Sequence, residues 1–432
     1  MLKTVTDNGL LGTSCPFREI DLPGGANVLD EVGSWLRCRS WTAADWPLER
    51  LLADKRRTGD TVSVVLPALN EERTVGRIAS VIRGELMTGD VPLVDELVVM
   101  DSGSSDRTAE VAAAAGAKVI HRDEVLPRLP ARLGKGEVLW RSLLVTEGDL
   151  VCFVDADLTS FSPAFVTGIV GPLLADPSLR LVKAMYERPL GSVPDEPTTD
   201  SSPTSPPTPS APRSEAGAEA GSRTESGTES GIWSGAGAGA ESGSGSEPGS
   251  EVGSSLAGAG EEAGVSGTAS GGRDGDGQGR EGSPSGGGRV TELVARPLIN
   301  LHWPRLAGFV QPLGGEYAAR RELLERLPFP VGYGVELGLL VDALELAGLD
   351  ALAQVDVGVR HHRHQDARAL GRMAAAILAT AERRLGRAPR NLRLTQFDRG
   401  PSGGFAPRTW PVEAEERPPM RGIPEYRGGT GV

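Results

Sequence analysis

Short apolar runs alternate with helical segments between residues 61 and 158, and this alternation limits the fold more than any other feature of the sequence. Four runs have the length and composition of buried strands: TVSVVLPALNEE, LVDELVVMD, AKVIHR and DLVCFVDADL. Strands that alternate with helices form right-handed crossovers on a mainly parallel sheet. We therefore predict an α/β fold whose functional loops lie at the carboxyl ends of the strands.

The stretch 191–288 has a different composition from the rest of the chain. It holds 25 of the 58 glycines, and its 15 acidic and 4 basic residues give it a net charge of −11 out of the total of −13. Such a segment buries too little apolar surface to offset its chain entropy. We expect a long disordered insertion here.

The insertion interrupts one domain rather than joining two, because neither flank contains an obvious complete core. The sequence on its two sides continues the same pattern of strands and helices. We divide the chain into a helical N-terminal preface (1–60), a first half of the domain (61–190), the insertion (191–288), the second half (289–399) and a Pro/Gly/Arg-rich flexible tail (400–432).

The charge outside the insertion is nearly balanced, so the chain has no basic field for nucleic acid or an anionic membrane. Cys15, Cys38 and Cys152 stand at unrelated spacings, which form neither a disulfide framework nor a zinc pattern and favour a reducing cytoplasm. No run approaches the ~18 apolar residues of a membrane-spanning helix. We expect no nucleic acid partner, no membrane insertion and a cytoplasmic location.

Two carboxylates, Asp155 and Asp157, follow the apolar run VCFV in FVDADL. Carboxylate oxygens suit Mg²⁺ or Mn²⁺, and such cations commonly arrive with a diphosphate that completes their coordination shell. The alternative is that Asp-x-Asp only caps a loop. The position of the pair at the end of a buried strand favours a leaving-group site.

Three of the five histidines, His361, His362 and His364, fall in GVRHHRHQD, just after another predicted strand. A parallel sheet could bring this segment to the same edge as Asp157, where one imidazole would be a further metal ligand. The alternative is a set of solvated loop side chains. Arg360 and Arg363 flank His362, where they would serve phosphates or only the surface.

PALNEE and DSGSSDRT follow the first two predicted strands, where a nucleotide would lie in an open α/β sheet. Asn70, Glu71 and Asp101 could bond ribose hydroxyls or base edges, and Ser102 and its neighbours allow backbone approach. Lys135 stands at the start of a predicted helix and suits a phosphate or a base carbonyl. The alternative for each residue taken singly is an ordinary turn or helix N-cap, and this alternative is favoured for Ser104, Ser105 and Asp106.

GGGRVTE supplies glycines for close approach, Arg289 for a forked contact and Thr291 for a hydroxyl, which suits an acidic acceptor. The alternative is that Arg289 is a surface charge after the insertion. Glu336 in GYGVELG could hold sugar hydroxyls or be a carboxylate stabilised at a helix N-terminus.

These motifs together, in this order, resemble those of the actinobacterial glucosyl-3-phosphoglycerate synthases, which are retaining glycosyltransferases of the GT-A fold. The resemblance rests on PALNEE, DSGSSDRT, GKGEVLW, FVDADL, GRVTELVARPL, QPLGGEYAARRELL, GYGVELGLL and GVRHHRH, and it spans about 41–397 outside the insertion. It implies a Rossmann-like, mainly parallel sheet with flanking helices. It also implies transfer of glucose from UDP-glucose to 3-phosphoglycerate with Mg²⁺ or Mn²⁺, by a homodimer.

The resemblance also assigns roles to residues of this chain. The halves 61–190 and 289–399 become the parts that bind the nucleotide sugar and the acceptor, with Asp157, Glu336, Leu313 and Arg289 as the catalytic set. The nucleotide sugar would contact Pro67, Leu69, Asn70, Glu71, Ser102, Lys135, Asp155, Gly314 and Glu336. The acceptor would contact Gly288, Arg289, Thr291 and His364, and the metal would bind Asp157 and His362.

One position departs from the family pattern, because His364 stands where related sequences have an asparagine that helps to hold the acceptor. This difference concerns the identity of the acceptor.

Three alternative functions also stand beside the family resemblance. The first is a related transferase that uses a GDP-sugar, or that glycosylates plain glycerate. The second is an inverting transferase, although its Gln-x-x-Arg-Trp type motif and membrane helices are absent from the sequence. The third is a catalytically silent binder of sugar nucleotides.

Overall fold

The computed structural model describes residues 29–188, 288–361, 366–400 and 403–427. The predicted insertion therefore lies outside the described residues except for Gly288, and so do His362 and His364. The account below concerns the described ranges only.

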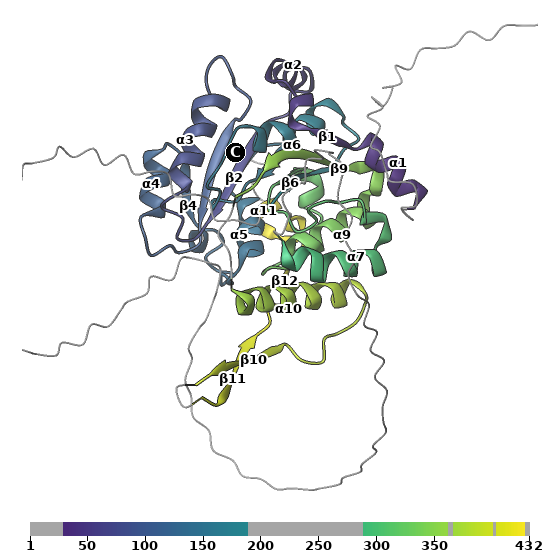
Figure 1. Ribbon diagram of the computed structural model, residues 1–432. Helices are drawn as coiled ribbons and strands as arrows, with labels where there is room; N and C mark the ends of the chain where they lie inside the picture. Colours follow the sequence, from purple (N-terminus) through teal and green to yellow (C-terminus); the bar gives the residue numbers. More distant parts are fainter. Residues whose placement is uncertain (1–28, 189–287, 362–365, 401–402, 428–432) are drawn as a thin grey trace, which may run out of the picture. The chain divides into compact units, whose positions relative to one another are not determined.

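Within the described residues, eight strands form the central sheet, in the order β1-β9-β6-β7-β5-β2-β3-β4 (Figure 1). β7 is antiparallel to both neighbours, and the other pairs are parallel. This arrangement confirms the predicted α/β fold with a mainly parallel sheet. The strands are β1 (Ser40–Thr42), β2 (Val62–Ala68), β3 (Glu96–Asp101), β4 (Lys118–His121), β5 (Leu150–Phe153), β6 (Leu181–Glu187), β7 (Tyr317–Arg320) and β9 (Leu352–Val359).

The sheet carries a hydrophobic core on each face. Successive side chains of a strand point to opposite faces, so Val64 and Leu66 of β2 join one core and Val65 joins the other. All seven residues of β2 are buried, which explains its continuous apolar sequence. The first core includes α2 (Leu48–Thr58), α3 (Val75–Leu86), α4 (Thr108–Ala114) and α6 (Ala164–Ala175), and the second includes α1 (Asp30–Cys38), α5 (Lys135–Ser142), α7 (Arg296–His302), α9 (Val335–Ala347) and α10 (Ala367–Arg384).

The described part of the N-terminal preface is only partly helical. It contains α1 and α2, but its three-residue strand β1 pairs with β9 and forms an edge of the sheet. The Trp35 indole N–H donates to the carbonyl of Leu352 at 2.7 Å, which fastens α1 beside the same strand. SWT is too short to show a strand period, so the sequence pattern missed this element.

Residues 403–427, expected as part of a flexible tail, are built into the fold. β10 (Arg393–Arg399) pairs with β11 (Phe405–Pro411), and β12 (Glu416–Arg417) pairs with β8 (Phe329–Pro330). Met420 is fully buried before α11 (Pro424–Arg427). The structure corrects the expectation, because β11 pairs with the preceding strand β10 and β12 is held by β8, a strand distant in the sequence.

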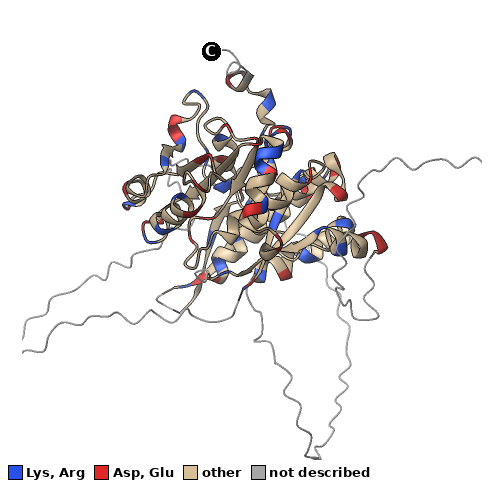
Figure 2. Ribbon diagram, turned by 90° about the horizontal axis from the view of Figure 1, so that it is seen from above, with Lys and Arg blue, Asp and Glu red and all other residues tan. Residues whose placement is uncertain are grey.

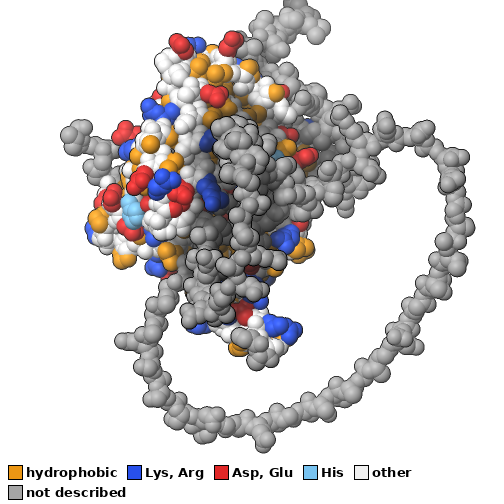
Figure 3. Space-filling view, turned by 60° about the vertical axis from the view of Figure 1, so that its left-hand side comes forward, with side chains coloured by type: hydrophobic (Ala, Val, Ile, Leu, Met, Phe, Trp, Pro, Cys, Tyr) orange, Lys and Arg blue, Asp and Glu red, His pale blue; other side chains and the backbone are white. Residues whose placement is uncertain are grey.

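Charged residues of both signs are intermixed over the described helices and loops (Figure 2). The same is true of the face seen in Figure 3, where basic, acidic and hydrophobic side chains alternate. Among the helices of the described ranges, none combines the length and the apolar character that crossing a membrane requires.

Candidate active site

The candidate site lies at the edge of the sheet where the parallel strands end. The loops after β2, β3 and β5 meet there, together with the segment that follows β9. Because β7 runs in the opposite direction, the loop before it, residues 311–316, arrives at this same edge.

Lys135, Asp155 and Glu336 form the centre of this edge. The Lys135 ammonium contacts Asp155 Oδ1 at 2.5 Å and Glu336 Oε1 at 3.0 Å. Lys135 and Glu336 lie in the first turns of α5 and α9, so the two helices direct their N-termini to the same point. Gly315 closes over this group, since a Cβ there would lie 2.5 Å from Asp155 Oδ1 and closer still to Lys135 Nζ.

Arg360 joins this centre to the second aspartate of the FVDADL motif. Its Nη2 lies 2.9 Å from Asp155 Oδ2 and 3.1 Å from Asp157 Oδ1, and its Nε lies 2.8 Å from Glu316 Oε1. The Arg360 side chain is only 5% exposed. The sequence suggested Arg360 as a phosphate or surface residue, and it gave no sign that this arginine would link three carboxylates.

The buried charges set the protonation of the centre. Burial raises the pKa of Asp155, but the charges of Lys135 and Arg360 outweigh burial and bring the pKa down to about 2. Burial raises the pKa of Glu316, against the opposing charge of Arg360. Asp155 is therefore ionised at any physiological pH.

Asp157 is the carboxylate of the site that is open to a ligand. Its side chain is 40% exposed, and within the described ranges only Oδ1 has a partner, Arg360. Asp155 fits a metal poorly because both of its oxygens are engaged. The described ranges contain no cluster of three or more His, Cys, Asp or Glu side chains that could hold a metal ion.

The segment that leads to His362 nevertheless runs beside Asp157. Arg360 contacts the Asp157 carboxylate, and the Thr159 hydroxyl donates to the carbonyl of His361 at 3.4 Å. His362 itself lies outside the described residues. The two segments expected to share a metal thus approach each other on adjoining residues.

The loops after β2 and β3 are joined by hydrogen bonds. Asn70 has a left-handed backbone with φ 58°, and its side-chain Oδ1 accepts from the Ser105 N–H at 2.8 Å, while its own N–H donates to the Ser104 hydroxyl at 3.0 Å. The Glu71 N–H donates to the Thr108 hydroxyl at 2.8 Å. Pro67 is buried at the end of β2, and Leu69 is half-buried after it.

Asp101 and Ser102, which stand next to each other, have different surroundings. Asp101 accepts from the N–H and the hydroxyl of Ser104, so this carboxylate caps its own loop, as the alternative reading held. The Ser102 hydroxyl is buried and has no hydrogen-bond partner within the described part of the chain. An unpartnered buried hydroxyl fits a site that a ligand completes.

Three of the four expected acceptor residues, Gly288, Arg289 and Thr291, lie at the start of a short π-helix, η3 (Thr291–Ala295), and the fourth, His364, lies outside the described residues. Gly288 has φ +93°, which favours glycine, and Thr291 is buried. The Arg296 guanidinium, on the next turn, donates to the Val310 carbonyl at 2.9 Å and so links this helix to the loop before β7. π-helices are frequent at functional sites.

Leu313 and Gly314 lie in the loop before β7, and that loop is fastened to β6 beneath it. The Lys183 ammonium donates to the Gly314 carbonyl at 2.7 Å, and the Gln311 amide donates to the Tyr186 carbonyl at 3.1 Å. Burial lowers the pKa of Lys183 to about 8. Sequence reasoning missed Lys183, because a lone lysine inside an apolar strand carries no motif.

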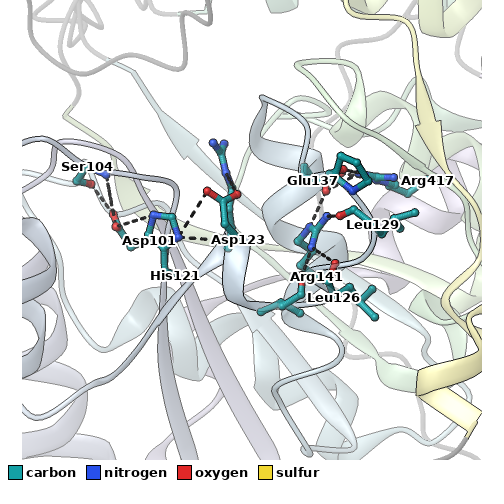
Figure 4. A network of polar contacts seen from close by, with 12 residues as sticks. Asp101, Ser104, His121, Asp123, Leu126, Leu129, Glu137, Arg141 and Arg417 are labelled. Carbon is teal, nitrogen blue, oxygen red and sulfur yellow. Dashed lines mark hydrogen bonds and ion pairs between the residues drawn. The ribbon is translucent and has the colours of Figure 1, made fainter.

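Two polar networks flank the site (Figure 4). In the first, His121 lies between Asp101 and Asp123, with its Nε2 3.9 Å from Asp101 Oδ2. In the second, the buried Glu137 pairs with Arg141 at 2.6 Å and with Arg417 at 2.6 Å. The second network ties the C-terminal segment to α5, the helix that carries Lys135.

The chain is similar to known sugar-transferring enzymes. The sequence model described as Glycosyl transferase family 2 matches residues 63–200. The glucosyl-3-phosphoglycerate synthase of Mycolicibacterium paratuberculosis is 41% identical over 392 residues, which cover 90% of this chain and 92% of the relative.

Solved structures give the same result. The glucosyl-3-phosphoglycerate synthase of Mycobacterium tuberculosis, crystallised with Mn²⁺, UDP and glucosyl-3-phosphoglycerate, matches with a TM-score of 0.62 and 36% identity over 89% of this chain and 98% of the other. The mannosyl-3-phosphoglycerate synthase of Rubrobacter xylanophilus matches with a TM-score of 0.65 and 33% identity over 91% and 98%. The fold is therefore the expected GT-A fold.

Proposed function

This chain belongs to the glucosyl-3-phosphoglycerate synthase family, and from that premise we propose that it transfers glucose from UDP-glucose to a hydroxyl of 3-phosphoglycerate, with Mg²⁺ or Mn²⁺. One observation carries the proposal. Lys135, the aspartate pair Asp155 and Asp157, and Arg360 come from three separate segments and converge at the carboxyl edge of the sheet, where α/β folds bind nucleotides.

The nucleotide sugar would lie across the loops after β2, β3 and β5. Pro67, Leu69, Asn70, Glu71 and Ser102 would hold uridine, and the buried Ser102 hydroxyl would gain a partner from it. Lys135 and Asp155 would orient the diphosphate and the sugar. Glucose would contact Glu336 and the backbone of Leu313 and Gly314.

Asp157 and His362 would hold the divalent cation, which supplies positive charge to a departing diphosphate. The open carboxylate of Asp157 fits this role, since its Oδ2 has no partner in the described part of the chain. Asp155 would not bind the cation directly, because it stays ion-paired with Lys135 and Arg360.

Asp155 is not the general base in this proposal, because a carboxylate with a pKa of about 2 is too weak a base to remove a proton near neutral pH. In the mechanism we propose, the acceptor hydroxyl attacks from the face that UDP leaves, and its proton passes to the leaving phosphate. The anomeric configuration is then retained. Gly288, Arg289, Thr291 and His364 would hold the acceptor in place for this attack.

The direct test incubates the protein with UDP-glucose, 3-phosphoglycerate and Mg²⁺, and follows UDP release and the mass of the product. We expect glucosyl-3-phosphoglycerate only when all three are present. Retained UDP binding without any turnover would instead support the catalytically silent binder.

The metal assignment has a paired test. His362→Ala should abolish metal-dependent turnover, whereas His361→Ala should spare it, since the described contact of His361 uses its backbone carbonyl. Equal losses from both variants would refute the assignment of His362.

A second candidate is transfer of mannose or glucose from a GDP-sugar, which the likeness to the mannosyl-3-phosphoglycerate synthase favours. The two functions are separated by comparing kcat/KM for UDP-glucose, GDP-glucose and GDP-mannose, each paired with 3-phosphoglycerate and with glycerate.

We also propose a cytoplasmic homodimer. The outer face of the β10–β11 hairpin exposes Phe397 and Phe405 (58% and 67%), and an isolated hairpin is only marginally stable, so a second copy could cover it.

A further inference from the structure

The order of strands in the sheet gives an order of subsites along its edge. β3 and β2 lie at one end, β5 with the two aspartates comes next, and β7, β6 and β9 follow. Neighbouring strands are about 4.8 Å apart, so the end of β6 lies about 10 Å from β5 and about 14 Å from β2. If uridine occupies the loops of β2 and β3, the end of β6 lies at the acceptor end of the site.

Arg188 is the residue that follows β6 at this end. Glu187 and Val359 are paired partners in β6 and β9, and the Arg360 N–H donates to the Glu187 carbonyl at 2.9 Å. Arg188 therefore leaves the sheet beside Arg360, one residue from the segment that leads to His362.

The Arg188 guanidinium is held by Tyr186 but makes no ion pair with a carboxylate of the described residues. Its Nη2 donates to the Tyr186 hydroxyl at 3.0 Å, and its Cζ lies 5.2 Å from the centre of the Tyr186 ring. Its Nε is buried without a hydrogen-bond partner, and no carboxylate of the described residues lies within 4.0 Å of it. A half-buried arginine without a direct ion pair among the described residues keeps hydrogen-bond donors that an anionic ligand could use.

Tyr186 connects this guanidinium rigidly to the centre of the site. The Tyr186 hydroxyl lies 2.8 Å from Glu316 Oε2, and Glu316 is the ion-pair partner of Arg360. Arg188 is thus held at a defined place relative to the Arg360 guanidinium and Asp157. A planar guanidinium held in this way can bind a carboxylate or phosphate through two parallel hydrogen bonds.

We propose that Arg188 binds the anionic group of the acceptor, a phosphate or a carboxylate, and that it selects acceptors that carry this charge. The inference rests on the proposed function and adds a binding residue that the family motifs did not point to. The donor diphosphate is the other anion of the reaction, but its expected place at β5 lies two strands away.

The test is Arg188→Gln, assayed in the full chain with UDP-glucose, Mg²⁺ and 3-phosphoglycerate. Loss of hydrogen bonds between charged groups should raise the KM for 3-phosphoglycerate about 10- to 100-fold. The KM for UDP-glucose should change less than about twofold. Arg188→Lys should recover part of the loss, because it keeps the charge but not the fork.

Arg180→Gln is the matched control, since Arg180 precedes β6 at the opposite edge of the sheet and is half-exposed beside Glu322. Its kinetics should equal those of the parent chain. Calorimetric titration of 3-phosphoglycerate into each UDP–Mg²⁺ complex reports the same loss without turnover, and circular dichroism identifies a variant that has not folded.

Two analogues tell which anion is bound. If Arg188 contacts the phosphate, the difference between the Arg188→Gln variant and the parent chain disappears with glycerate. If it contacts the carboxylate, the difference disappears with glycerol 3-phosphate, measured as a competitor. An unchanged acceptor KM, or a raised KM for UDP-glucose alone, overturns the inference, while absence of turnover in the parent chain counts against the proposed function instead.

Discussion

Replacing Arg417 by alanine should remove a large part of the protein's stability. Arg417 is buried, and its guanidinium donates to Glu137 Oε2 at 2.6 Å, to Glu137 Oε1 at 2.8 Å and to the Pro130 carbonyl at 2.7 Å (Figure 4). Its Cζ also lies 5.3 Å from the centre of the Trp140 ring. Glu137 is fully buried in α5, and Arg141 is its other partner.

The magnitude follows from these contacts. Removing one partner of a buried ion pair costs about 3–5 kcal/mol, because the remaining charge stays in a poorly solvating interior. Glu137 keeps Arg141, which favours the lower end, while the Pro130 carbonyl loses its donor at a further cost of about 1 kcal/mol. We expect a loss of about 3–4 kcal/mol. At about 2–4 °C per kcal/mol for a large domain, the Tm should fall by roughly 6–16 °C.

Urea unfolding followed by tryptophan fluorescence and calorimetric melting measure this change. The control is Arg421→Ala, whose side chain is 51% exposed beside Glu325 and should change stability by less than about 1 kcal/mol. If Arg417→Ala cost no more than Arg421→Ala, residues 416–421 would not be an integral part of the fold.

Three further outcomes are expected. Gly315→Ala should lower kcat/KM at least about 100-fold with an unchanged circular dichroism spectrum, because the added Cβ would displace Lys135 and Asp155. The control Gly84→Ala should leave kcat/KM unchanged, because a Cβ at Gly84 would meet nothing within 4 Å. Full turnover by the Gly315 variant would contradict the prediction. Lys183→Met should lower kcat by a larger factor than it changes the KM for the acceptor, because the Gly314 carbonyl loses its hydrogen-bond donor. An unchanged kcat would show that the loop before β7 does not need this hydrogen bond. Burial raises the pKa of Glu413 from 4.5 to about 7, so between these pH values the folded chain binds more protons than the unfolded chain. The free energy of unfolding should therefore fall by at most about 3 kcal/mol as the pH rises from 4.5 to 7. Glu413→Gln should flatten this part of the profile of stability against pH, and an equal slope in both proteins would refute the prediction.

The parts of the fold that the sequence predicted are those with a strong local pattern. β2, β3 and β5 are short apolar runs that end in polar loops, and each is a strand of the central sheet. The convergence of these loops could also be predicted, since parallel strands end at one edge of a sheet.

The parts that the sequence did not predict depend on contacts between distant segments. Arg360 contacts Asp155 across 205 positions of sequence, and Arg417 contacts Glu137 across 280. A single arginine looks the same in a sequence whether it faces solvent or links buried carboxylates. β12 was missed for the same reason, because it is stabilised by β8, which lies far away in the sequence. β11 pairs with the preceding strand β10, and the Pro/Gly/Arg-rich composition of this stretch concealed that local hairpin.

Because β1 pairs with β9, β1 can join the sheet only late in the synthesis of the chain. Ser40 is the register partner of Gln354, so the first strand of the described residues lacks its neighbour in the sheet until more than 300 further residues have been added. At about 5–20 residues per second, the ribosome needs roughly 15–60 s to supply that neighbour. During this time the apolar side of α1, including Trp35 and Val32, has no sheet edge to cover. Nascent chains halted before residue 352 should therefore expose the N-terminal segment to chaperones and proteases, and chains halted well after residue 359 should protect it.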